Sequence, residues 1–454
     1  MIQPERVEWL RSGEPGREGF VLLWVQSSVR TRDNHALEYA AGEARRLGVP
    51  LAAVFALNPA YPEANARHFQ YLLEGLRDLR AGLAARGIPL SVRVGDPPEV
   101  VREAARGASL VVTDRGYLRP GRQWRASLAG RLEVPFVQVE SDAVVPIRVV
   151  SQKQEVGART LRPKLQRVLE RFLVPLEVQE GAKGHPDWDP GLDVSDPART
   201  VRALGVDGSV PPGEEEGGEG KALARLSHFV IHLLPSYDAG RRDPNVDGGS
   251  RLSAYLHYGH LSPLTAALAA RQHSEGGPGL DTFLEEMIVR RELSFNFCEF
   301  NPAYERYEGL PTWARATLEA HAADPRPHLY TREELDAAAT HDPYWNAAQR
   351  EMVRTGRMHN ALRMYWGKKI LEWTATPQEA YATALFLNNR YQLDGRDANS
   401  YAGVGWIFGL HDRPWARRPI FGTVRYLAAS GLRRKFDADG YARRWAEGGH
   451  VELP

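Results

Sequence analysis

The chain is poor in cysteine and in long apolar runs. Its 454 residues contain one cysteine, Cys298, which excludes an internal disulfide framework and suggests a reducing compartment. No apolar run approaches the ~20 residues that a membrane-spanning helix needs, and the first residues lack the apolar core of a secretory signal. We therefore expect a soluble, cytoplasmic protein, and we expect it to be a monomer.

Other common signatures are also missing. No Cys/His cluster has the spacing of metal ligands, so we expect no metal site. No Gly-x-Gly-x-x-Gly follows the first expected strand, which excludes a standard dinucleotide-binding half. The formal net charge is +1, which gives no global signal for nucleic acid. Residues 411–444 nevertheless contain nine Lys or Arg against three Asp. This patch could contact a phosphate backbone, although a solvated helical surface is the simpler interpretation of the charges alone.

The first ~150 residues, enough for one domain, alternate short apolar segments with amphipathic ones. The expected strands are residues 20–26, 51–57, 90–94, 110–113 and 136–139, and the expected helices are 36–47, 68–86 and 98–106. This alternation predicts a Rossmann-like α/β domain with a parallel, helix-covered sheet. Ligands of such sheets bind at the carboxyl ends of the strands, so a second chromophore of unidentified type has a place there.

The middle of the chain has the composition of a linker. Residues 181–186 and 210–220 are dense in Gly, Pro and Glu, which cannot bury a core. From about Lys221 onward, helical periodicity dominates. We predict an α/β domain over 1–150, an interdomain linker over 151–220 and an all-helical domain over 221–454.

Tryptophans are regularly spaced in the helical part. Trp366 and Trp373 are seven residues apart, which places them two turns apart on one helix face, about 10 Å along the axis. Trp345 lies upstream and can pack between them. Three indoles in a row are a plausible path for single electrons, although a buried aromatic stripe is the ordinary interpretation of a tryptophan pair.

Characteristic blocks surround this tryptophan pair. The run Arg-Met-Tyr-Trp-Gly-Lys-Lys-Ile-Leu-Glu-Trp at 363–373 precedes Tyr-Gln-Leu-Asp-Gly-Arg-Asp-Ala-Asn at 391–399, and further blocks occupy 23–26 with 32–37, 255–263, 285–293, 409–415 and 421–426. In these blocks and their order, the chain resembles the class II cyclobutane pyrimidine dimer photolyases over nearly its whole length. The resemblance implies a deoxyribodipyrimidine photo-lyase, which uses light to split the cyclobutane ring joining two adjacent pyrimidines in UV-damaged DNA.

The resemblance also implies that the helical domain binds FAD. Arg363 and Asp394 match the ion pair beside the flavin ring, and Asn388 matches the partner of flavin N5. A permanent cation at that place stabilises negative charge on the reduced ring. The residues that match the phosphate contacts are Tyr237, Gly249, Ser250, Arg251, Leu252 and Ser253.

Further matches concern the damaged DNA. Glu286 matches an acid that hydrogen-bonds the dimer, best with its proton retained by burial, and Glu285 beside it serves as a control. Met364 and Trp406 match an apolar wall for a dinucleotide that has left the stack. Arg241 is expected at the lesion phosphate. Arg413 and Arg425 are expected to contact the DNA.

The tryptophans match a photoreduction chain in which Trp366 is nearest the flavin. Trp345 and Trp373 follow it, and Tyr330 and Tyr365 are candidate terminal donors. Such a chain restores the reduced cofactor and takes no part in the repair step itself. Because the cofactor carries the chemistry, the lack of a nucleophile–base pair is expected.

Two alternatives stay open. A cryptochrome-like photoreceptor would keep FAD and the indoles but need no lesion pocket; Glu286, Met364 and Trp406 together, and the lack of a long C-terminal tail, favour repair. A nucleotide-binding regulatory module with a helical partner-binding domain is the candidate from another class. An absorbance spectrum and a repair assay distinguish these functions.

Overall fold

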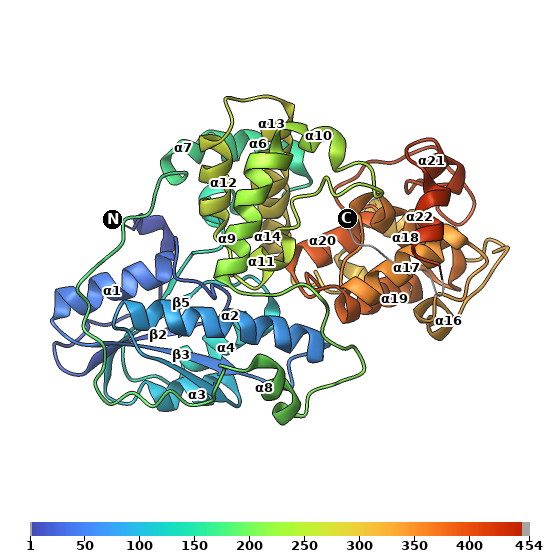
Figure 1. Cartoon of the computed structure of the whole chain (residues 1–454). Helices are drawn as coiled ribbons and strands as arrows, with labels where there is room; N and C mark the ends of the chain where they lie inside the picture. The colour runs from blue at the N-terminus through green and yellow to red at the C-terminus, as the bar shows by residue number, and fades with distance from the viewer. Residues whose placement is uncertain (1, 447–454) are drawn as a thin grey trace. The chain divides into compact units, whose positions relative to one another are not determined.

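A computed structural model describes residues 2–446, which form two compact units (Figure 1). Of the described residues, the first unit contains 2–150, 165–228 and 251–273, and the second contains 151–164, 229–250 and 274–446. This division differs from the expected one, because two segments beyond residue 150 join the N-terminal unit. Within residues 2–446, no helix combines the length and apolarity of a bilayer span.

The first unit is built on a six-stranded sheet of order β1-β6-β5-β2-β3-β4. Neighbouring strands are parallel except β1 and β6, which are antiparallel. The strands are β1 (Val7–Arg11), β2 (Phe20–Val25), β3 (Leu51–Leu57), β4 (Leu90–Val94), β5 (Ala108–Asp114) and β6 (Phe136–Val139). All five expected strands are present. Strand β1 was not predicted from the sequence, because its half-exposed residues do not form a continuous apolar run.

Helices cover both faces of this sheet (Figure 1). Val21, Leu23 and Val25 of β2 pack in one core with helices α1 (His35–Leu47) and α2 (Ala66–Ala85). Phe20, Leu22 and Trp24 pack in the other core with α3 (Pro97–Ala104) and α4 (Arg119–Ala129). Burial on both faces explains why the strands are continuously apolar in sequence. The predicted α/β fold of this part is confirmed.

The segment expected to be a linker contains ordered structure. Part of it lies against the sheet, where Leu51 and Val92 form bridges with Gly184 and Gly191, and the Trp188 indole nitrogen donates to the Ala53 carbonyl at 2.9 Å. A segment of this composition can therefore be fixed by backbone hydrogen bonds without a core of its own. The remaining helices of residues 2–228 and 251–273 are η1 (Pro4–Arg6), α5 (Ile147–Val150), α6 (Ala158–Gln166), α7 (Leu169–Phe172), α8 (Pro197–Leu204), α9 (Glu219–His228), α11 (Ser253–His257) and α12 (Pro263–Gln272).

The described part of the second unit is helical, as predicted. Helix α18 (Asn360–Trp373) packs against α17 (Pro343–Thr355), α19 (Pro377–Tyr391) and α20 (Ala398–Ile407). The other elements are η2 (Phe229–Leu233), η3 (Leu234–Ser236), α10 (Tyr237–Gly240), α13 (Pro278–Leu284), η4 (Glu285–Arg290), α14 (Arg291–Phe300), η5 (Tyr307–Gly309), α15 (Thr312–Ala320), α16 (Arg332–Asp336), α21 (Ala429–Arg433) and α22 (Ala438–Arg444).

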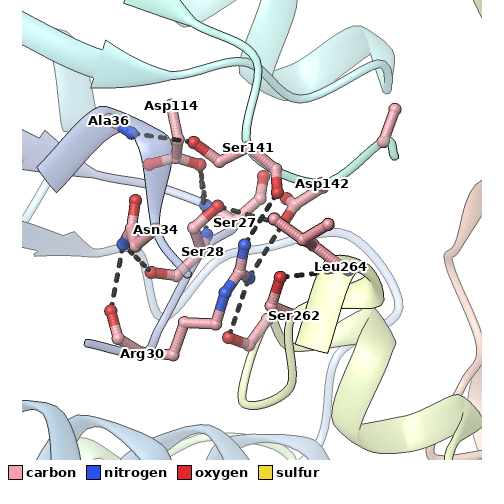
Figure 2. A network of polar contacts seen from close by, with 12 residues as sticks. Ser27, Ser28, Arg30, Asn34, Ala36, Asp114, Ser141, Asp142, Ser262 and Leu264 are labelled. Carbon is pink, nitrogen blue, oxygen red and sulfur yellow. Dashed lines mark hydrogen bonds and ion pairs between the residues drawn. The ribbon is translucent and has the colours of Figure 1, made fainter. Parts of the chain in front are cut away.

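A buried polar network joins the carboxyl ends of β2, β5 and β6 in the first unit (Figure 2). The Asp114 carboxylate accepts hydrogen bonds from the backbone N–H groups of Gln26, Ser27 and Ser28 at 2.7, 2.6 and 3.1 Å. Burial, with the charge of Asp142 nearby, raises the pKa of this carboxyl above its ordinary value. Asp114 therefore fixes the loop after β2 at the carboxyl end of the sheet.

An ion pair extends the network. The Arg30 guanidinium donates to Asp142 at 2.9 Å and to the carbonyls of Ser141 and Gly259 at 2.8 and 3.1 Å. The Arg30 side chain is 1% exposed, so its charge is compensated by buried partners. Arg30 thereby connects the end of β6 to the segment before α12.

We predict that Asp114→Ala destabilises the protein by about 1–3 kcal/mol or more, because it leaves the buried N–H of Ser28 and the partly buried N–H groups of Gln26 and Ser27 without their acceptor. Asp114→Asn should cost less, since its amide oxygen still accepts. Urea denaturation measures both changes. Asp96→Ala is the control, because the exposed Asp96 side chain does not cap its helix; equal stability of the two Ala variants would contradict the role of Asp114.

Candidate functional site

Three tryptophans of the second unit are in contact inside the helix bundle. The ring centroids of Trp366 and Trp345 are 6.4 Å apart with the planes 6° from parallel, and those of Trp345 and Trp373 are 5.9 Å apart at 64°. All three side chains are at most 2% exposed. Trp345 of α17 therefore lies between the two indoles that α18 presents, and the three rings form a continuous aromatic path.

Hydrogen bonds hold the first two indoles in place. The Trp345 ring nitrogen donates to the backbone carbonyl of Trp366 at 2.9 Å, and the Trp366 ring nitrogen donates to Gln349 Oε1 at 2.9 Å. Buried indoles need such acceptors. Because Gln349 lies on the same helix as Trp345, these contacts lock α17 to α18 in one register.

The two candidate terminal tyrosines lie in different surroundings. Tyr330 is partly exposed, and its ring centroid is 5.6 Å from that of Trp373. Tyr365 is fully buried and donates its hydroxyl to the Asp342 carboxylate. Burial, followed by the charge of Asp342, raises the pKa of Tyr365 far above the ordinary value for tyrosine. Tyr330 thus extends the aromatic path toward solvent, whereas Tyr365 lies wholly inside the bundle.

A polar network lies near the start of the same helix. Arg363 forms an ion pair with Asp394 at 3.5 Å and donates to the side-chain oxygen of Gln392. Gln392 in turn donates to Asn388 Oδ1 at 3.0 Å, and Asn388 donates to Asn389 at 3.2 Å. The structure therefore brings together Arg363, Asp394 and Asn388, all singled out from sequence. Gln392 connects them and was missed, although it stands two residues before Asp394 in the same block.

One N–H donor of the Arg363 guanidinium has no acceptor among the described residues. Its Nε is buried and has no hydrogen-bond partner among the described residues. An unpaired buried donor of a cation is costly unless a bound group accepts from it. A polar, electron-rich ring such as a flavin would satisfy this donor, so the residues present fit the cofactor that the sequence implies. Among residues 2–446, no cluster of His, Cys, Asp or Glu could hold a metal ion.

The turn that carries Asp394 is not an ordinary surface turn. Arg396 is 4% exposed with φ of 59°, and its side chain donates to the Asn389 carbonyl at 2.8 Å. A Cβ at Gly395 would lie 2.9 Å from the Asn389 Cα, so glycine is required by the close approach to α19. This packing fixes the position of Asp394 relative to Asn388.

A second cluster joins residues for which separate roles were expected. Glu286 of η4 accepts from the Tyr237 hydroxyl at 2.8 Å and forms an ion pair with Arg241. The Arg241 guanidinium also lies 5.9 Å from the centre of the Tyr237 ring. The Glu286 side chain is 33% exposed, so it lacks the deep burial that was expected. Arg241 is instead positioned to neutralise it.

Met364 and Trp406 are both half-buried in the second unit. The Arg290 guanidinium lies 5.2 Å from the centre of the Trp406 ring, at cation–π distance. Glu285 holds Arg290 at 3.2 Å and also pairs with Arg162 at 2.7 Å. Glu285 is thus linked to Trp406 through Arg290, which makes it unsuitable as the neutral control that the sequence suggested.

The two arginines expected at the DNA both lie at cation–π distance from one exposed indole. The guanidinium carbons of Arg413 and Arg425 are 5.5 and 5.0 Å from the Trp415 ring centre. Trp415 is 41% exposed, and its ring nitrogen donates to Asp412 at 3.3 Å. We call Arg413, Trp415 and Arg425 the Trp415 cluster. No role for Trp415 was predicted from the sequence, although a tryptophan close to arginines is a recognisable nucleic-acid pattern.

The run Gly249–Ser253 crosses the boundary between the two units, with Ser250 in one and Arg251 in the other. Arg251 adopts a left-handed backbone conformation with φ of 55°. Leu252 is buried, and Ser253 opens α11, which has only five residues. The helix is too short for its dipole to support the phosphate-binding argument made from the sequence. Tyr237, expected beside this run, donates its hydroxyl to Glu286.

Comparisons with known proteins identify the family of the chain. The DNA photolyase family model matches residues 21–181. The deoxyribodipyrimidine photo-lyase of Methanothermobacter thermautotrophicus is 48% identical over 98% of this chain and 98% of its own, and that of Oryza sativa subsp. japonica is 43% identical over 94% of this chain and 87% of its own.

A solved structure shares the fold at low identity. The crystal structure of a Synechocystis cryptochrome has a TM-score of 0.75 at 18% identity and covers 94% of this chain and 88% of that chain. At this identity the likeness concerns the fold alone. The near-full-length relatives determine the assignment: the chain belongs to the DNA photolyase family.

Proposed function

We propose that this protein is a lyase that uses light to repair cyclobutane pyrimidine dimers in DNA. One observation carries the proposal: the 48% identity to a deoxyribodipyrimidine photo-lyase over 98% of both chains. Enzymes that act on a base inside a duplex extrude it into a pocket, so a surface for DNA and a site for the extruded lesion are both required.

We assign FAD as the cofactor and the Arg363–Asp394–Gln392–Asn388 network as the protein groups beside its ring. When bound, the cofactor absorbs light and supplies the electron that opens the dimer. Arg363 contributes a permanent cation with a free Nε donor, and Asp394 orients it. Gln392 ties this cation to Asn388, whose amide can donate or accept and therefore suits more than one redox state.

We assign the Tyr237–Arg241–Glu286 cluster and the half-buried Met364 and Trp406 to the damaged dinucleotide. Glu286 can accept from the imide edge of a pyrimidine, and Arg241 can exchange its carboxylate partner for a DNA phosphate. Trp406 offers a flat surface on which an extruded base can stack. The Trp415 cluster combines cations with an aromatic ring and is assigned to the DNA backbone around the lesion.

The finer expectations from the sequence remain proposals. The blocks at 363–373 and 391–399 support assignment to class II within the family. A second chromophore, a monomeric state and a cytoplasmic location stay predictions. The cryptochrome-like photoreceptor is the alternative function, and the fold does not distinguish it, since a cryptochrome structure shares this fold.

The deciding experiment measures repair in light and in the dark. Purified protein with chemically reduced FAD is mixed with an oligonucleotide that contains one dimer, and intact product is quantified. Repair only in light supports the proposal. Bound flavin without repair would favour the photoreceptor, and protein that binds no flavin after reconstitution would contradict both.

We predict that Trp366→Phe abolishes photoreduction of oxidised FAD and leaves repair intact when the cofactor is reduced chemically. The reason is that the indoles form a path into the protein and do not belong to the lesion residues. Absorbance under continuous light measures photoreduction, and the repair assay measures the second property. Equal loss of both would place Trp366 in the lesion site or in an essential structural role.

We predict that Glu286→Ala keeps its FAD but lowers the quantum yield of repair. A lost hydrogen bond to a developing charge costs about 3 kcal/mol in thermal enzymes, and this is an upper bound for a photochemical branching ratio. Glu333→Ala is the matched control, because Glu333 also lies in a helical segment but its side chain is 77% exposed. An unchanged yield in Glu286→Ala would remove this residue from the mechanism.

We predict that Arg425→Ala and Trp406→Ala change DNA binding in different ways. Arg425→Ala should weaken damaged and undamaged DNA by similar factors and reduce the salt slope by about one, because a phosphate contact is lost. Trp406→Ala should erode mainly the preference for damaged DNA, since only an extruded dimer can stack on it. Affinities for both DNAs at two salt concentrations test this. A uniform loss in Trp406→Ala would contradict the assigned lesion wall.

A further inference from the structure

The outer end of the indole path terminates in a tyrosine whose hydroxyl is held by one histidine. Tyr330 donates its backbone N–H to the Trp373 carbonyl at 3.0 Å, and the two ring centroids are 5.6 Å apart. The Tyr330 hydroxyl lies 2.7 Å from His341 Nδ1 and 3.0 Å from the backbone nitrogen of His341. His341 therefore makes two contacts with one oxygen atom.

The two contacts place a donor and a base at the Tyr330 oxygen. The backbone N–H of His341 can only donate, so the Tyr330 oxygen accepts from it. In the neutral tautomer that carries its proton on Nε2, His341 Nδ1 accepts the hydroxyl hydrogen. In that tautomer the phenol is already hydrogen-bonded to a base.

We propose that His341 is the proton acceptor that makes Tyr330 the terminal electron donor of the indole path. One electron passes from Tyr330 to oxidised Trp373, which returns to the neutral indole. The phenolic proton passes at the same time to His341 Nδ1. The products are a neutral tyrosyl radical and an imidazolium, and charge is conserved. The initial oxidant of the path is a light-excited flavin, so this inference rests on the proposed function.

The other candidate tyrosine has a less useful acceptor. Tyr365 donates to Asp342, the residue that follows His341. Tyr365 and Asp342 are both buried. Asp342 also caps α17 by accepting from the backbone of Tyr344 and Trp345 at 2.9 and 3.1 Å. A carboxylate is ordinarily a weaker base than an imidazole by about two to three pKa units. A proton given to Asp342 would stay inside the bundle and return, whereas exposed His341 can release it.

The groups around His341 keep its imidazole neutral near pH 7. Partial desolvation, the charge of His328, whose ring is stacked 3.7 Å away, and the Lys369 cation lower the pKa of His341 below 6.5, against the opposing charges of Asp342 and Glu372. Lys369 is itself paired with Glu372 at 2.5 Å. Since only the neutral imidazole accepts a proton, transfer is fully available above this pKa. It is lost as the pH falls through that value, below the range of an ordinary histidine.

The first test needs no light. Histidine side-chain NMR of the full-length protein, with His341→Gln used for assignment, gives the pKa of His341 in the wild type and in Tyr330→Phe. A hydroxyl that donates to Nδ1 stabilises the neutral ring, so we expect the pKa to rise in Tyr330→Phe. An identical pKa in both proteins would overturn the proposal, whatever the protein's activity.

The second test follows the radical in the flavin-loaded protein by transient absorption and EPR with ring-deuterated tyrosine. His341→Gln should slow formation of the tyrosyl radical by on the order of a hundredfold, the low end for loss of a positioned base. The wild-type rate should fall in acid and the variant should lack that step. Equal rates and pH profiles would overturn the proposal.

Two controls separate this inference from the proposed function. His273→Gln removes another exposed histidine, whose Nδ1 lies 2.9 Å from a carbonyl of its own helix segment, and should match the wild type. Repair by His341→Gln with chemically reduced FAD should be normal, which shows that the variant is folded. Absent repair in every protein would contradict the proposed function, while the NMR result would still decide the Tyr330–His341 pair.

Discussion

The packing of Trp345 between Trp366 and Trp373 is the contact on which the rest of the second unit depends. It is dry, with all three rings at most 2% exposed, and it is fixed by hydrogen bonds from two indole nitrogens to α18 and to Gln349. Because these bonds set the register of α17 on α18, they also set where the ends of α18 lie. Arg363 is near one end of that helix and Trp373 is its last residue, so one rigid helix connects the polar network to the outer end of the indole path.

The polar network follows from that placement. Arg363 meets Asp394 only because a buried turn, with Gly395 against the backbone of Asn389, returns the chain to α18. Gln392 then bridges Arg363 and Asn388. The Arg363 Nε is buried without a hydrogen-bond partner among the described residues, and a bound electron-rich ring would complete its hydrogen bonding.

The sequence predicted much of this arrangement, and the failures have physical causes. All five apolar strands were predicted because burial on both faces makes them continuously apolar, whereas β1 was missed because it is a half-exposed edge strand. The linker was misjudged because backbone hydrogen bonds, invisible in composition, fix residues near Gly184 and Gly191 to the sheet. The spacing of Trp366 and Trp373 could be predicted from helix geometry. The ion pair of Glu286 with Arg241 could not, since it depends on how η4 meets α10.

The groups around the aromatic residues differ between the inner and the outer end of the path. The inner indoles have only neutral hydrogen-bond partners, so a positive charge on them is poorly solvated. This favours transfer of the charge to the next aromatic residue of the path. At the outer end, Trp373 has the Lys369 cation 5.6 Å from its ring centre, which further disfavours a positive charge there. Tyr330 lies next to it with a base on its hydroxyl, and a tyrosine that loses its proton on oxidation carries no charge at all. The path therefore ends where the charge can leave as a proton, and His341 lies between that proton and the solvent.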